Sequence, residues 1–106
     1  MLRHSLLTTK VLLDVRSERD RQDSEWGEQN HPDGTSWEWC EASNLAHRLN
    51  AKHVAEGTLT WHAILREEMM EAFAEENKDK LRAELIQVAA VALAWCEKLD
   101  REKGTK

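Results

Sequence analysis

Apolar residues recur at helical spacing along most of the chain, and no stretch of any length alternates with the period of two that is typical of strands. The first predicted helix runs from about Thr9 to Glu25. Its inner stripe becomes polar toward the C-terminal end: Val11, Leu12, Val15, Arg19, Gln22 and Trp26. A loop over residues 27–34 follows, with Pro32-Asp33-Gly34 as a turn signal.

The second predicted helix begins at Thr35-Ser36-Trp37-Glu38, which has the pattern of a capping box. In such a box the Thr35 hydroxyl and the Glu38 carboxylate each accept a backbone N–H of the first turn. The helix continues to about Ala55, and Gly57 ends it. Its expected inner positions are Trp37, Cys40, Leu45 and Leu49.

The third predicted helix is capped by Thr60 and runs to Glu76, where Asn77 or Lys78 interrupts the pattern. Its inner stripe is Trp61, Leu65, Met69, Ala72 and Phe73. Glu68 lies one position off this stripe, so we expect it to border the core.

The fourth predicted helix runs from Asp79 to about Lys103 and is stopped by Gly104. Leu81, Leu85, Val88, Ala92, Trp95 and Leu99 follow the alternating spacing of four and three that forms the seam of a helix bundle. Between residues 85 and 96 this helix is apolar nearly all round, which is typical of a helix buried in a core or an interface. The pattern therefore predicts an all-α four-helix bundle completed by oligomerisation, as a homodimer or homotetramer; a self-sufficient monomer is the alternative.

Length and composition bound the remaining possibilities. The chain has 106 residues and a net charge of −5, which favours a single domain over residues 1–106 and argues against duplex nucleic acid as a ligand. The longest apolar run, residues 88–96, is about half of what a membrane crossing needs, and the first residues lack the apolar region of a signal peptide. Cys40 and Cys96 have no metal-binding spacing, so we expect reduced thiols in a cytoplasmic protein. The five histidines form no i, i+4 pair, which argues against a His-based metal site.

Acidic residues cluster in the third predicted helix, at positions 67, 68, 71, 75 and 76. Pairs three or four positions apart share one face of a helix and repel by roughly 0.2–0.5 kcal/mol each. Glu84 and Gln87 have the same spacing on the fourth helix, and an antiparallel connection brings them level with Glu68 and Glu71. Facing carboxylates bind hard cations such as Mg²⁺, although a solvated acidic face has the same pattern.

The stretch from Leu65 to Leu99, about a third of the chain, is similar to the all-α nucleotide pyrophosphohydrolases of the MazG type. Their signature is ExxE on one helix and ExxD on the next. Here Glu68-Met69-Met70-Glu71 is followed after twelve residues by Glu84-Leu85-Ile86-Gln87, within a flank, LRAELIQVAAVALAW, that resembles the family's LRxELGDLLxQVVxxA. Upstream, WGEQNH over residues 26–31 resembles the family's entry segment CPWDxxQTH.

The resemblance implies a MazG-like fold and Mg²⁺-dependent hydrolysis of a nucleoside triphosphate to monophosphate and pyrophosphate. The metal, Mg²⁺ with Mn²⁺ as the alternative, would be held by Glu68, Glu71, Glu84 and Gln87. Glu67 and Glu68 are the expected catalytic residues, with Glu67 orienting or deprotonating the attacking water. Arg82, Lys80 and Arg19 are candidates for binding the phosphates, and Trp26, Gln29 and His31 are candidates for binding the base.

The last acidic position of the family pattern is occupied by Gln87, whose amide oxygen can bind Mg²⁺ but brings no charge. Two other functions therefore stand beside hydrolysis. One is a non-catalytic protein of the same fold that binds a nucleotide or another phosphorylated small molecule. The other is a helical interaction module with an acidic face.

Overall fold

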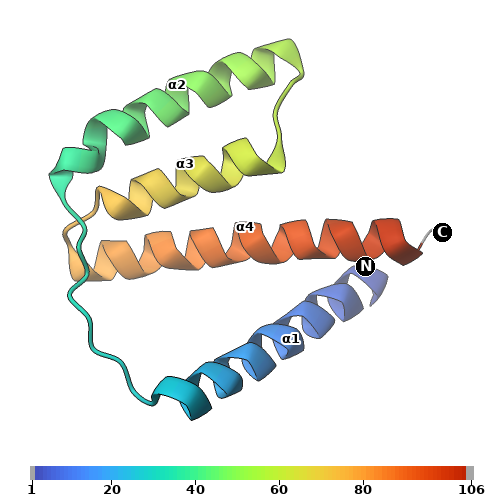
Figure 1. Cartoon of the computed structure of the whole chain (residues 1–106). Helices are drawn as coiled ribbons and strands as arrows, with labels where there is room; N and C mark the ends of the chain where they lie inside the picture. The colour runs from blue at the N-terminus through green and yellow to red at the C-terminus, as the bar shows by residue number, and fades with distance from the viewer. Residues whose placement is uncertain (1, 105–106) are drawn as a thin grey trace. The chain divides into compact units, whose positions relative to one another are not determined.

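The computed structural model describes residues 2–104, and every regular element within that range is helical. In chain order these are α1 (Leu2–Trp26), a short 3-10 turn η1 (Trp37–Trp39), α2 (Cys40–Glu56), α3 (Trp61–Phe73) and α4 (Lys78–Gly104) (Figure 1). The predicted all-α class with four helices is confirmed. Among the described residues, no helix is long and apolar enough to cross a membrane.

The chain divides into two compact units. One consists of Met1–Pro32 and Leu93–Lys106, and therefore holds α1 and the last part of α4. The other is Asp33–Ala92, which holds η1, α2, α3 and the first part of α4. Within this second unit α3 lies between α2 and α4 and runs antiparallel to both (Figure 1).

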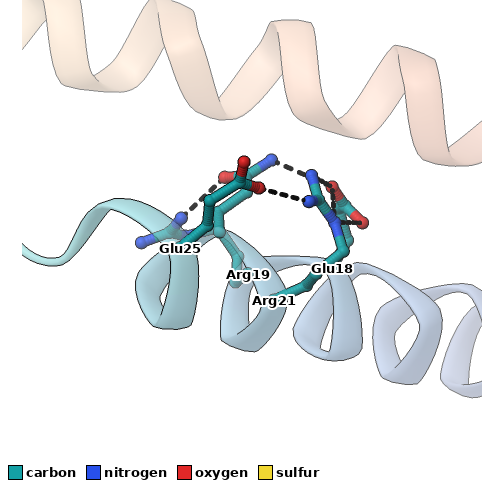
Figure 2. Close-up of polar contacts among 5 residues, drawn as sticks. Glu18, Arg19, Arg21 and Glu25 are labelled. Atoms are coloured by element: carbon teal, nitrogen blue, oxygen red, sulfur yellow. Dashed lines mark hydrogen bonds and ion pairs between the residues drawn. The ribbon is translucent and has the colours of Figure 1, made fainter.

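Helix α1 begins at Leu2, seven residues before the predicted start. Of the expected inner stripe only Val11 is buried, while Leu12 and Val15 are half exposed, so that part of the prediction is wrong. The physical reason is that the C-terminal half of α1 is held by its own charges. Arg21 pairs with Glu18 at 2.6 Å and with Glu25 at 2.8 Å, as Figure 2 shows. A polar helix can persist in solvent when such pairs recur every turn.

The start of α2 differs from the predicted capping box. Ser36, not Thr35, is the cap, and its Oγ accepts a hydrogen bond from the backbone N–H of Glu38 at 3.2 Å. The 3-10 turn precedes the α-helix because its backbone is tied to the end of α3. The N–H of Ser36 donates to the Phe73 carbonyl at 2.9 Å, and that of Trp37 donates to Glu76 Oε1 at 2.9 Å.

The expected inner face of α2 is also wrong. Trp37 is 71% exposed, and Cys40, Leu45 and Leu49 are exposed as well. The buried residues of α2 are instead Ser43, Ala46 and Asn50. Small and polar side chains of α2 face α3, because the facing side of α3 carries buried alanines and the glutamates described below. Hydrophobicity alone therefore selects the wrong side of this helix.

The boundaries of α3 are fixed by side-chain caps. Thr60 Oγ1 accepts from the Ala63 N–H at 3.1 Å, as predicted. The helix ends at Phe73, three residues before the predicted end. Asn77 then caps α4, because its Oδ1 accepts from the Lys80 N–H at 3.0 Å. The connection between α3 and α4 is therefore short, and this fixes how the two helices face each other.

Replacing Thr60 with Ala should lower the free energy of unfolding by about 1 kcal/mol, because the Ala63 N–H loses its acceptor. Thr60→Ser keeps the hydroxyl and should cost much less. Urea unfolding followed by circular dichroism measures both variants. Equal losses in the two variants would show that the hydroxyl does not stabilise this helix end.

Candidate metal centre

Three glutamates converge between α3 and α4. Glu68 and Glu71 are one turn apart on α3, and Glu84 lies in the second turn of α4. One carboxylate oxygen from each lies within 4.8 Å of the other two, and all three residues are half-buried. The structure therefore brings these three residues close together, as predicted. The short connection after Phe73 produces it, because an antiparallel return places the second turn of α4 beside the middle of α3.

Two carboxylate oxygens of this cluster have no partner in the described part of the protein. Glu68 Oε2 and Glu84 Oε2 are buried, and neither has a hydrogen-bond partner among the described residues. A buried charged oxygen without a partner is costly, and proteins normally pair it or place a metal beside it. Two ionised carboxylate oxygens no more than 4.8 Å apart repel by roughly 3 kcal/mol or more at an effective dielectric constant of 20.

Burial and the neighbouring charges both raise the proton affinities of this cluster. Burial raises the pKa of Glu71 to about 7, with further contributions from the charge of Glu68 and from a hydrogen bond with Glu84. The pKa of Glu68 is also raised, first by burial and then by the charges of Glu84 and Glu67. In the absence of a cation the cluster therefore retains a proton near neutral pH.

His47 of α2 reaches the same cluster from the opposite side of α3. Its Nδ1 lies 2.9 Å from Glu67 Oε2, and its Nε2 lies 2.9 Å from Glu71 Oε1. Histidine spacing within one helix does not reveal this residue, because it is a single histidine contributed by a neighbouring helix. A signal was present in the sequence, since His47 and Asn50 are three positions apart and form a polar stripe on α2.

Asn50 anchors this side of the cluster. The residue is 7% exposed, and its Nδ2 donates to Glu67 Oε1 at 2.7 Å and to the Ala63 carbonyl at 2.9 Å. Both oxygens of Glu67 are therefore engaged, one by Asn50 and one by His47. The predicted role of Glu67 in orienting or deprotonating water stays a prediction.

The other residues predicted for this site lie on α4. Gln87 follows Glu84 by one turn and is exposed. Lys80 and Arg82 are exposed in the first two turns, and neither side chain has a hydrogen bond or ion pair with the rest of the described chain. Their proposed contacts with metal or phosphate stay predictions.

The predicted base-binding residues lie together in the first unit. Trp26, Gln29 and His31 line an open hollow of ≈ 480 Å³. An adjacent hollow of ≈ 710 Å³ is lined by Trp26, Gln29 and Arg19 among others. Arg21 covers part of the Trp26 ring, with its guanidinium carbon 5.7 Å from the ring centroid, and Arg19 pairs with Asp23 at 2.7 Å. The structure groups these three residues, and their role in binding a base stays a prediction.

The second unit thus presents three half-buried carboxylates with an imidazole beside them. Carboxylate oxygens are the ligands that Mg²⁺ prefers, and an imidazole extends the choice toward transition metals. No protein-family model, curated protein or solved structure matches the chain.

Proposed function

We propose that this protein hydrolyses a nucleoside triphosphate, NTP or dNTP, to monophosphate and pyrophosphate with Mg²⁺ or Mn²⁺ held by Glu68, Glu71 and Glu84. The observation that carries the proposal is the pair of buried, unpartnered oxygens, Glu68 Oε2 and Glu84 Oε2, beside a third carboxylate. Because a hard divalent cation needs oxygen ligands and neutralises repelling carboxylates, the residues present fit it.

The paired motifs add support from the sequence. Glu68 and Glu71 match the ExxE of the MazG-type pyrophosphohydrolases, and Glu84 matches the first position of their ExxD. These three residues are the ones that approach within 4.8 Å of one another. The proposed fold is accordingly a MazG-like bundle.

In the proposed reaction a water attacks the α-phosphorus, and the bond from that phosphorus to the oxygen bridging to the β-phosphorus breaks. Monophosphate and pyrophosphate leave, and the water's proton passes to a nearby base. The bound cation would neutralise phosphate oxygens and lower the pKa of the water. Glu67 is the proposed base or orienting group, and Arg82 and Lys80 are proposed to contact the phosphates.

Gln87 provides a test of the metal set. If it is a weak neutral ligand, Gln87→Asp should raise Mg²⁺ affinity, because a carboxylate attracts a divalent cation much more strongly than an amide does. The metal-free variant should be less stable than the wild type because a charge is added to a repelling cluster. Mg²⁺ titrations with pyrophosphate release followed in parallel measure both effects. Weaker nucleotide binding and no turnover in the variant would show instead that the amide serves ligand binding.

We also propose that a second copy of the chain covers the exposed apolar side of α4, giving a homodimer or homotetramer. Leu85 is 50% and Ile86 54% exposed in the single chain, although both belong to its most apolar stretch. Exposed apolar residues that cluster on one helix are typical of an association surface. Light scattering at micromolar concentration should give a mass of at least two chains, and a folded monomer would contradict this part of the proposal.

The alternative is a non-catalytic protein that binds a nucleotide or another phosphorylated small molecule. The neutral Gln87 at the family's acidic position favours it. A screen of the eight common NTPs and dNTPs for pyrophosphate release, with Mg²⁺ and with Mn²⁺, separates the two functions. Hydrolysis predicts release from at least one nucleotide; binding without any release would favour the alternative.

A further inference from the structure

The side of α2 that does not face α3 carries exposed apolar residues. Leu45 is 49% exposed and Leu49 is 36% exposed. Because α3 lies between α2 and α4, no other α-helix within residues 33–92 covers this side (Figure 1). A hollow of ≈ 670 Å³ is lined here by Glu41, Ala42, Asn44, Leu45 and Arg48. This outer surface of α2 is therefore open to a partner.

Charges of opposite sign flank Leu45 along this surface. Four positions follow the spacing of four, three and four that forms one stripe of a helix: Glu41, Leu45, Arg48 and Lys52. Glu38 precedes them in η1. The acidic residues thus lie on the N-terminal side of Leu45 and the basic ones on its C-terminal side. All four charged side chains are exposed, and none has a hydrogen bond or ion pair within the described part of the chain.

This order of charges is self-complementary when two copies of α2 run antiparallel and cross at Leu45. Glu41 lies four positions before Leu45 and Arg48 lies three positions after it, so each falls opposite the other on the partner copy. Glu38 and Lys52, seven positions to either side, match in the same way. A two-fold axis repeats both pairs, because in such an interface residue i contacts j and j contacts i. The two Leu45 side chains then meet at the axis and leave water.

We propose that α2 binds α2 of a second copy in antiparallel orientation, with Leu45 at the axis and the Glu41–Arg48 and Glu38–Lys52 pairs on either side. Complementary charges select the partner and fix the register, whereas burial of the apolar side chains supplies the main driving force. The surface differs from the exposed side of α4, and the two surfaces together give a homotetramer. The inference rests on the proposed function only in that the partner is again a copy of this chain.

Charge reversal tests the register. Glu41→Arg and Arg48→Glu should each halve the mass measured by light scattering at micromolar concentration, because like charges then face each other twice in the interface. The double variant Glu41→Arg/Arg48→Glu exchanges the charges and should restore the wild-type mass. Charges that only stabilise the helix through its dipole would make the double variant the least stable, without recovery of mass. Unchanged mass in the single variants, or no recovery in the double variant, would overturn the proposal. Glu56→Arg is the matched control, since Glu56 is exposed at the end of α2 beyond the paired positions, and its mass should stay that of the wild type.

A cross-link tests the position of the axis. In a chain with Cys40→Ser and Cys96→Ser, Leu45→Cys should oxidise to a covalent dimer, because the two copies of this position meet. Ala55→Cys in the same background is the control, since it lies about 15 Å along the helix from Leu45 and about 30 Å from its own copy. Equal cross-linking at the two positions would overturn the axis at Leu45.

The starting mass separates this surface from the one on α4. A fall from four chains to two in the single charge variants supports both surfaces. A fall from two chains to one supports the α2 surface and contradicts the α4 surface. A folded wild-type monomer would overturn both, and nucleotide hydrolysis would still have its own test in pyrophosphate release.

Discussion

Replacing Glu84 with Gln should reduce metal-dependent pyrophosphate release at least about a hundredfold while helix content is unchanged. Even residues that only support metal ligands affect activity by about 10- to 100-fold, and a ligand itself should matter more. Glu71→Gln should have the same effect, because Glu71 is also a proposed metal ligand. It contacts Glu84 on one side and His47 on the other. Steady-state rates at saturating Mg²⁺ and nucleotide measure the loss.

Glu56→Gln is the matched control for the two substitutions. Glu56 is exposed at the last position of α2, and its replacement removes the same charge away from the cluster. This variant should retain the wild-type rate. If Glu84→Gln keeps its activity and loses only helix content, the Glu84 carboxylate stabilises the fold and is not a metal ligand.

The metal-free protein should lose about 3 kcal/mol of stability between pH 4.5 and pH 7.5 through Glu71 alone. The folded chain holds this proton up to a pKa of about 7, whereas the unfolded chain releases it near the ordinary value of 4.5. The contribution is therefore fully present below pH 4.5 and is lost as the pH rises through 7. Urea unfolding in the presence of a chelator, repeated across this range, measures the trend.

Glu71→Gln removes the titrating group and should flatten the dependence. The variant should also be more stable than the wild type at pH 7.5 without metal, because like-charge repulsion is relieved. A lower stability of the metal-free variant at that pH would indicate that Glu71 stabilises the fold, and that the metal site has been misplaced.

The elements with strong local signals were predicted well. Thr60 and Gly57 mark helix ends in the sequence and do so in the structure, because capping depends on a few neighbouring residues. The paired glutamates were also predicted, since spacing along two antiparallel helices determines which positions are level. Glu68 borders the core as its place beside the apolar stripe implied.

Contacts between distant segments were not predictable in the same way. The capping box failed because Ser36 and Trp37 are bound by the end of α3, which the local pattern cannot express. The face of α2 was misjudged because His47 and Asn50 are drawn toward glutamates on another helix. In both cases polar tertiary contacts outweigh the hydrophobic pattern of one helix.

Thermal unfolding with increasing Mg²⁺, for the wild type and for Glu84→Gln in parallel, tests the cation site most directly. A cation that binds only the folded state raises the unfolding midpoint as its concentration exceeds the dissociation constant. The wild type should start lower, because its carboxylates repel, and rise with Mg²⁺ until the site is saturated. Glu84→Gln should start higher and rise little. An equal rise in both proteins, or no rise in the wild type, would contradict a metal centre at Glu68, Glu71 and Glu84.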